Sequence, residues 1–254
     1  MTFQIAKIRI VLAAASAAAV FAAPALAQTD PTPEWTGEGS VSAGVTSGNT
    51  STTDVGIAAK LKHSGAKWSE SGEFSDDYGK TDHVETKNRV AAAGQVDRVI
   101  TERLSGFGRL TYENDKFSGF ESRYYAGLGL AYKVLDSDKL NWTLQGGPGY
   151  KVDDVREQVS GTTIIPAHTE ESFGANAGSR FKWAINDKVD LSDDTDVTYS
   201  KVSTQIKNSL GLTVGLMGNL SARISYDVAY DTDPPLGFKS TDTATKVSLV
   251  YKIG

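Results

Sequence analysis

The chain contains no cysteine among its 254 residues, so disulfide bonds cannot stabilise it. It has only three histidines, His63, His83 and His168, which are widely separated in the sequence. A metal site uses two or more ligands at set spacings, so these scattered histidines predict none. Long apolar runs are missing after residue 27, which excludes a membrane-spanning helix of about 20 residues from that part of the chain.

The first 27 residues carry the pattern of a secretion signal. Two basic residues precede an apolar, alanine-rich run at 10–21, and residues 25–27 read Ala-Leu-Ala, an A-x-A cleavage site. The run is too short to span about 30 Å of hydrocarbon, which favours a removable signal peptide over an uncleaved anchor helix. We therefore predict cleavage between Ala27 and Gln28.

The mature chain is acidic. Its formal charge moves from −5 to −7 when Lys7 and Arg9 leave with the signal peptide. Because nucleic-acid binding needs a basic stripe, we expect no nucleic-acid partner. Residues 28–33 form a short lead-in with two prolines, and no linker rich in glycine, proline or serine divides the remainder of the chain. The sequence predicts a single domain at 34–254.

Apolar and polar residues alternate along most of the mature chain. From residue 35, one parity reads Trp, Gly, Gly, Val, Ala, Val and the other Thr, Glu, Ser, Ser, Gly, Thr. Successive side chains of a strand point to opposite faces, so one face is apolar and the other polar. Behind a secretion signal, such strands predict an all-β, antiparallel up-and-down barrel in contact with outer-membrane lipid. We expect twelve strands, near residues 34–46, 52–62, 67–78, 87–98, 103–114, 121–134, 140–153, 171–185, 188–199, 205–217, 220–231 and 242–253.

The connections between these segments favour the same fold. If the N-terminus is periplasmic, the even-numbered connections are short turns, and the odd-numbered ones include the three longest, 79–86, 154–170 and 232–241. Outer-membrane barrels alternate short periplasmic turns with longer external loops. Tryptophan and tyrosine gather near strand ends, as in two interfacial girdles. Two segments fit less well, because Glu70 and Asp193 fall on their otherwise apolar parity.

Two stretches resemble a known family. The first strand is built of small residues and closes on Ser-Gly-Asn-Thr at 47–50, and residues 123–132 are followed by Leu-Gln-Gly-Gly-Pro-Gly-Tyr at 144–150. Together they resemble the salt-induced outer-membrane proteins, an uncharacterised family, over most of the mature chain. The resemblance implies a barrel in the outer membrane of a Gram-negative bacterium, a link to salt or osmotic stress, and no catalytic residues. We expect such a barrel to meet periplasmic chaperones and the barrel-assembly machinery during biogenesis.

The polar parity of the strands supplies the candidate functional residues. Both signs of charge occur, which suits either the selectivity wall of a small pore or ion pairs that fill a closed lumen. The many long arginine and lysine side chains favour a narrow or occluded lumen. The lumen-facing candidates are Glu38, Asp54, Lys60, Arg109, Arg123, Lys133, Arg180, Arg223, Asp227 and Lys246, with Lys151, Lys182 and Lys252 on the same parity.

The sequence therefore predicts a structural or passive narrow-channel protein of the outer membrane, with no catalytic residues, metal or cofactor. Two alternatives stay open. A lipase or deacylase barrel would need a histidine and a serine on neighbouring strands, and we place no histidine inside a strand. A soluble periplasmic barrel that holds a ligand would point its apolar parity inward. The aspartate pairs 76–77, 153–154 and 193–194 fit no calcium loop, and we interpret them as solvated rim or lumen wall.

Overall fold

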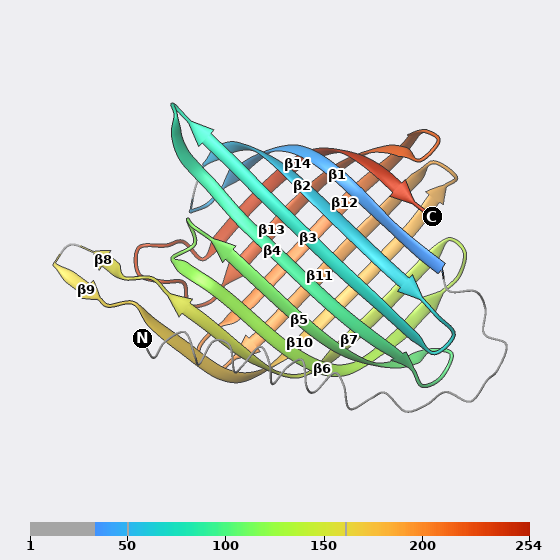
Figure 1. Cartoon of the computed structure of the whole chain (residues 1–254), viewed down its shortest axis with the longest axis horizontal. Helices are drawn as coiled ribbons and strands as arrows, with labels where there is room; N and C mark the ends of the chain where they lie inside the picture. Colours follow the sequence, from blue (N-terminus) through green and yellow to red (C-terminus); the bar gives the residue numbers. More distant parts are fainter. Residues whose placement is uncertain (1–33, 50, 161) are drawn as a thin grey trace.

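The computed structural model describes residues 34–49, 51–160 and 162–254. The predicted signal peptide, its cleavage site between Ala27 and Gln28, and the lead-in at 28–33 lie outside these residues. Within the described part of the chain, twelve strands close into one barrel and two short strands form a hairpin that projects from one end (Figure 1). No helix among the described residues is long and apolar enough to cross a membrane.

The barrel strands are antiparallel, and the first closes against the last. Their bounds are β1 Glu34–Ser47, β2 Thr52–Ser64, β3 Trp68–Thr81, β4 Val84–Val99, β5 Leu104–Asp115, β6 Phe120–Asp136, β7 Leu140–Val155, β10 His168–Asn186, β11 Val189–Ser200, β12 Thr204–Met217, β13 Leu220–Asp231 and β14 Thr241–Ile253. The projecting hairpin is β8 Gln158–Ser160 and β9 Thr163–Ile165. The predicted twelve-stranded antiparallel barrel is confirmed, and each predicted strand bound lies within three residues of the observed one.

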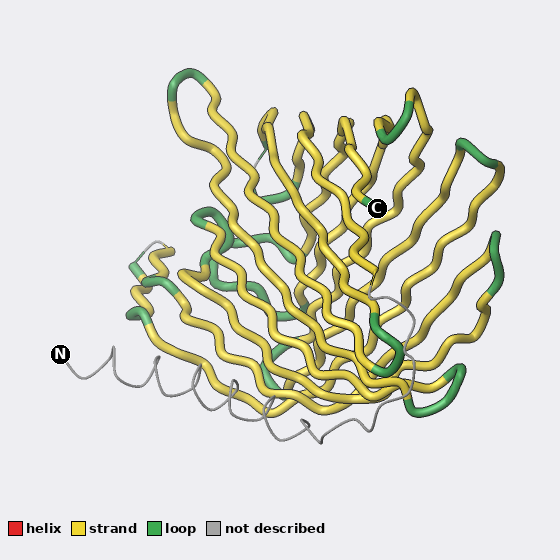
Figure 2. Tube along the Cα trace, turned by 45° about the vertical axis from the view of Figure 1, so that its right-hand side comes forward, coloured by secondary structure: helices red, strands yellow, loops and turns green. Residues whose placement is uncertain are grey.

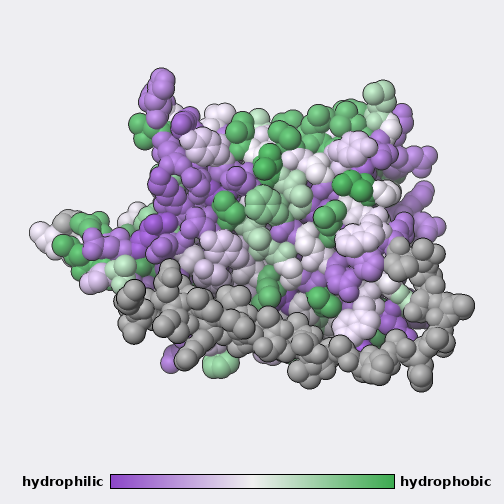
Figure 3. Space-filling view, in the orientation of Figure 1, coloured by the Kyte–Doolittle hydropathy of each residue, from purple (hydrophilic) through white to green (hydrophobic). Residues whose placement is uncertain are grey.

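The apolar parity forms the outer wall of the barrel. Val41, Ile57 and Leu128 keep 53–62 % of their surface exposed, whereas Asp54 and Asp77 on the polar parity are almost fully buried. Apolar residues lie across the middle of the outer face, and hydrophilic residues gather towards its two ends (Figure 3). The alternation of the sequence therefore sorts side chains between an apolar exterior and a charged interior.

Aromatic residues divide between the two ends of the outer wall. All four tryptophans, Trp35, Trp68, Trp142 and Trp183, lie towards the end where β1 begins and β14 finishes, which is the predicted periplasmic end. Tyr132 and Tyr251 lie at the same end, whereas six other tyrosines lie towards the opposite, predicted external end: Tyr78, Tyr112, Tyr124, Tyr150, Tyr199 and Tyr230. Amphipathic rings at two levels are the arrangement of interfacial girdles in membrane barrels.

Two connections differ from the sequence-based expectation. Loops and turns gather at the two ends of the tilted strands (Figure 2), but the predicted long loop at 79–86 is wrong. There β3 and β4 continue to a two-residue turn at Asp82 and His83, whose φ angles are 48° and 67°. Two consecutive residues in the left-handed backbone conformation give a turn whose twist matches the right-handed twist of the flanking strands, so a tight hairpin forms. A second long connection, predicted at 154–170, contains the β8–β9 hairpin.

The prediction that no histidine lies inside a strand is also wrong. His63 belongs to β2, where it pairs with Trp35 of β1, and its ring centroid lies 4.7 Å from the indole. His168 is the first residue of β10. Both strands continue past the end of their apolar alternation, because polar residues extend the pairing there.

Candidate functional site

The interior of the barrel is the candidate functional site. Two cavities of about 450 Å³ and 300 Å³ occupy it. They share lining residues, among them Lys60, Glu73, Arg89, Glu113 and Lys207, so they adjoin one another inside the wall. Nearly all of these shared residues are charged, and both signs are present.

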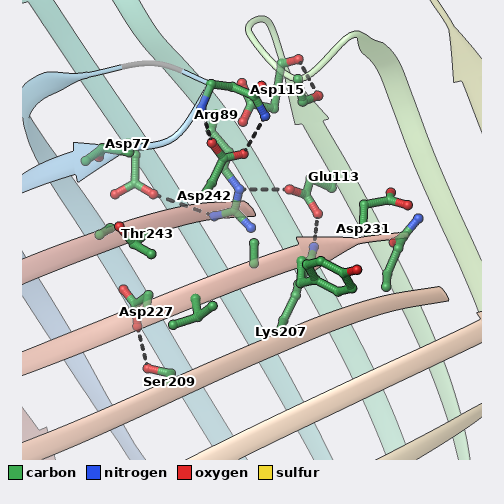
Figure 4. Close-up of a pocket in the computed structure, with 18 of the residues that line it drawn as sticks. Asp77, Arg89, Glu113, Asp115, Lys207, Ser209, Asp227, Asp231, Asp242 and Thr243 are labelled. Carbon is green, nitrogen blue, oxygen red and sulfur yellow. Dashed lines mark hydrogen bonds and ion pairs between the residues drawn. The ribbon is translucent and has the colours of Figure 1, made fainter. Parts of the chain in front are cut away.

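A carboxylate of β5 connects two sides of the barrel. Arg89 Nε of β4 donates a hydrogen bond to Glu113 Oε1 at 2.9 Å, and Lys207 of β12 forms an ion pair with the other oxygen (Figure 4). On its other side Arg89 lies 3.6 Å from Asp77, which accepts a 2.6 Å hydrogen bond from Lys246. Strands β5 and β12 are five places apart in the twelve-strand ring. The Lys207–Glu113 pair therefore crosses the lumen rather than running along the wall.

A second group of charges also crosses the lumen. Arg123 of β6 donates to Asp231 of β13 at 2.8 Å, and these strands are again five places apart in the ring. The same guanidinium lies 3.3 Å from Asp153, which also pairs with Lys151 at 2.8 Å. Asp153 is 2 % exposed, so its charge is balanced almost entirely by these two cations. The Lys207–Glu113 and Arg123–Asp231 ion pairs both narrow the open cross-section of the lumen.

The remaining arginines of the predicted set pair with Glu38 and Asp196. Arg223 holds Glu38 with two hydrogen bonds, of 2.7 and 2.8 Å, from its two terminal nitrogens. Such a two-pronged contact uses the planar fork of the guanidinium. Arg180 donates to Asp196 at 2.6 Å, and Arg109 lies 4.0 Å from the same carboxylate. These contacts join strands β1, β13, β10, β11 and β5 inside the barrel.

The other predicted residues occupy different surroundings. Asp54 accepts a 2.8 Å hydrogen bond from Thr46, and Asp227 accepts one of 2.6 Å from Ser209. Lys60 lines both cavities, and among the described residues no carboxylate lies within 4.0 Å of its ammonium. Lys133 is half exposed at the predicted periplasmic rim, where it pairs with Asp136 rather than facing either cavity.

Several interior charges are absent from the lumen-facing candidates although they share the same parity, and two of them, Asp77 and Asp153, are buried rather than solvated as expected. The absent charges are Asp77, Arg89, Glu113, Asp153, Lys207 and Asp231. Their position on the polar parity is a signal that sequence reasoning could have used. Their partners across the lumen depend on strand order and on the shape of the barrel section, which the alternation does not encode.

The connection at 232–240 covers part of the larger cavity. Pro234, Pro235 and Phe238 line that cavity, and Asn49 holds the end of the connection. Asn49 Nδ2 donates to the Lys239 carbonyl at 3.1 Å and to Asp242 at 2.9 Å, while the Lys239 amide donates back to Asn49 Oδ1.

Gly48 makes this contact possible. Its φ of 132° is a backbone conformation that favours glycine, and a Cβ at this position would collide with Asp242. The Gly-Asn pair of the 47–50 motif therefore holds the 232–240 connection over the larger cavity, at the predicted external end.

The histidines lie at separate places around the structure. His63 contacts Glu70 at 2.8 Å on the outer wall, and His168 contacts Glu170 at 3.3 Å at the predicted external rim. Among the described residues, no three histidine, cysteine, aspartate or glutamate side chains are placed to hold a metal ion. The expectation that the protein holds no metal and no cofactor stays a prediction.

Comparisons with known proteins agree with this fold. Residues 39–253 match the family model described as "Protein of unknown function, DUF481". The "Uncharacterized protein YdiY" of Escherichia coli (strain K12) is 22% identical over 221 residues, which cover 85% of this chain and 83% of that protein.

Two solved outer-membrane structures are similar in shape. The NanC porin has a TM-score of 0.54 at 14% identity and covers 84% of this chain and 99% of its own. The COG4313 outer membrane channel from Pseudomonas putida F1 has a TM-score of 0.50 at 9% identity and covers 91% of this chain and 100% of its own. At these identities the likeness shows a shared barrel fold.

Proposed function

This chain belongs to the DUF481 family of proteins of unknown function, and from that premise we propose that it is an outer-membrane barrel with a narrow passive channel. One observation carries the proposal: two adjoining cavities lined by charges of both signs lie inside the wall. Charged groups are costly to bury in a dry core unless each is fully paired. Lys60 and Glu73 line both cavities and stay exposed, so the lumen suits water and small ions.

The outer wall supports a place in the outer membrane. Val41, Leu128 and Leu249 are each more than half exposed, and a soluble barrel would have to leave all such side chains in water. A periplasmic barrel that holds an apolar ligand would instead turn them inward. The apolar exterior, the two levels of aromatic rings and the fold shared with outer-membrane channels favour lipid as the surrounding medium.

Restricted and weakly selective conduction is expected from the interior charges. The Lys207–Glu113 and Arg123–Asp231 pairs both span the lumen, so a solute must pass beside them. Cations and anions meet carboxylates and ammonium groups along the same path, which gives neither sign a strong advantage.

We propose that the chain has no catalytic centre. Among the described residues, the ring nitrogens of His63 and His168 contact Glu70, Glu170 and the Pro166 carbonyl. Neither ring forms a hydrogen bond with a serine in that part of the chain. A serine nucleophile needs an adjacent base. Release of fatty acid from phospholipid or lipid A by the purified barrel, lost on changing one serine or histidine, would overturn this part.

The link to salt or osmotic stress rests on the family resemblance alone. It predicts that cells grown in high salt contain more of this protein than cells grown in low salt, which quantitative immunoblotting would measure. Equal amounts would remove the stress role without affecting the channel. Assembly through periplasmic chaperones and the barrel-assembly machinery is expected on the same ground as for other barrels, and depletion of the assembly machinery should lower the folded amount.

Planar-bilayer recording of the refolded protein tests the channel. We expect small current steps whose size depends on bath salt, and a reversal potential close to zero in a potassium chloride gradient. A double variant, Glu113→Gln with Lys207→Met, should give larger steps because it removes one ion pair across the lumen. A lipid-facing change, Leu249→Val, is the control and should leave the steps unchanged. Absence of steps in both the native protein and the double variant would overturn the proposal.

A further inference from the structure

Asp193, Thr195 and Asn208 form a group of hydrogen-bonded polar side chains on the outer wall that the channel does not explain. Asp193 of β11 pairs in register with Phe181 and Leu210, so its side chain points outward with theirs. Asn208 of β12 donates to Asp193 Oδ1 at 2.6 Å and to the Thr195 hydroxyl at 2.9 Å. Asp193, Thr195 and Asn208 are all partly covered by their neighbours. We call these three residues the outer polar cluster.

The outer polar cluster lies between the two aromatic levels, nearer the predicted periplasmic one. Its register neighbour Phe181 is two residues from Trp183 at the predicted periplasmic end, and Val197 and Tyr199 lie beyond it towards the external end. Ionisable side chains at this depth are costly in hydrocarbon, and in membrane proteins they usually face a protein partner or a water-filled space. The strand register turns these side chains away from the lumen, while Asn208 also borders the larger cavity.

The wall beside the cluster is built of small residues. Ala175, Ala177 and Ser179 occupy successive outward positions on β10, and Ala177 pairs with Gly146 of β7. Small residues on a lipid-facing surface let another backbone approach closely, as they do between membrane helices. On the opposite side of the ring, β1 and β2 also present small residues outward, at Gly37, Gly39, Ala43 and Ala59. There they alternate with the larger side chains of Val41, Val45, Val55, Ile57 and Leu61.

We propose that this face, the outward residues of β10, β11 and β12, binds a second copy of the chain within the membrane. The outer polar cluster is self-complementary, because Asn208 offers both a donor and an acceptor, and Asp193 offers acceptors. Asp193 and Asn208 are bonded to one another and therefore lie at nearly the same depth. A two-fold axis along the membrane normal would place each Asn208 against the cluster of the other copy.

A second copy fits this face better than lipid does. Acyl chains have no group that can hydrogen-bond to a carboxylate or an amide at this depth, so lipid leaves the cluster unsatisfied. A soluble protein cannot reach a surface inside the hydrocarbon. The inference rests on the proposed location in the membrane, but not on conduction.

Cysteine cross-linking tests the interface cleanly, because the chain has no cysteine of its own. Ala177→Cys places a thiol beside the cluster, and Ala59→Cys on β2 is the matched control on the far side of the barrel; both alanines are exposed on the outer wall. The refolded proteins are placed in phospholipid vesicles and treated with a short, membrane-permeant bis-maleimide. We expect a cross-linked dimer with Ala177→Cys and none with Ala59→Cys.

A second substitution identifies the cause of the pairing. Adding Asn208→Leu to Ala177→Cys should lower the cross-linked fraction about tenfold, because the hydrogen bonds between copies are lost. Adding Thr245→Leu, which removes an outward hydroxyl from β14, should leave that fraction unchanged. If Asn208→Leu has no more effect than Thr245→Leu, the cluster does not hold the dimer and the proposal is wrong.

Labelling with a membrane-impermeant maleimide separates the two possible failures. If both thiols are protected and neither protein cross-links, the barrel lies in the membrane as a monomer, and only this inference is overturned. If both thiols react freely in intact vesicles, the outer wall faces water, and the proposed membrane location fails with it.

Discussion

Replacing Leu128 by arginine tests the assignment of the outer wall most directly. Leu128 is 59 % exposed and lies on β6 four residues from Tyr124 and four from Tyr132, which mark the two aromatic levels. Four residues of a strand tilted by about 40° correspond to roughly 10 Å of depth, so Leu128 lies near the membrane midplane. An arginine at that depth costs about 2–4 kcal/mol of folding free energy. The folding equilibrium constant should therefore fall about 30- to 700-fold.

The measurement is a urea titration of the refolded barrel in phospholipid vesicles. Leu135→Arg is the matched control, because Leu135 is on the same strand and is 40 % exposed, but lies at the predicted periplasmic end beyond Tyr132. Near the interface the same substitution should cost only about 0–1 kcal/mol. Equal costs at the two positions, or a larger cost at Leu135, would refute the view that this face contacts hydrocarbon.

Three further outcomes are expected. Glu38→Leu should lower the free energy of unfolding by about 1–3 kcal/mol, because it leaves the Arg223 guanidinium without its two-pronged partner; the double variant Glu38→Leu with Arg223→Leu should recover part of that loss in the same titration. Asn49→Ala should release the connection at 232–240 and raise single-channel conductance, and unchanged steps would show that this connection does not restrict flow. Mass spectrometry of the native protein should find Gln28, or pyroglutamate formed from it, at the N-terminus, and recovery of the uncleaved chain would contradict the processing prediction.

Strand number, strand bounds and the facing of most side chains were predictable because they depend on a local signal of period two. The immediate neighbours of Val41 and Leu128 are enough to assign both residues to the outer wall. The contact between Glu113 and Lys207 cannot be found in this way, since the residues are 94 positions apart and meet only when the sheet closes. Strand order, register and the shape of the barrel section all enter that contact.

Polar residues on the apolar parity marked positions where the outer wall differs from a plain lipid-facing surface. Asp193 was visible in the sequence as a polar residue on an apolar parity, and Asn208 occupies such a position on the next strand. Their hydrogen bond becomes apparent only once the register of β11 and β12 is known. The turn at Asp82 and His83 was missed because polar residues flank it, and polarity at a strand end resembles a loop.

The pairing of β1 with β14 has a consequence for how the wall is completed. Eleven register pairs join these two strands, although they lie at opposite ends of the mature chain. Contacts from more distant strands reinforce the same joint: Glu38 of β1 binds Arg223 of β13, and Lys246 of β14 binds Asp77 of β3. Without β14, the other eleven barrel strands would form an open sheet with two unpaired edges, which are sites for pairing with other chains. Pairing of β14 with both β1 and β13 closes that sheet into a ring and leaves no free edge. Opening the barrel at β14 therefore requires breaking two strand pairings together with the ion pairs beside them.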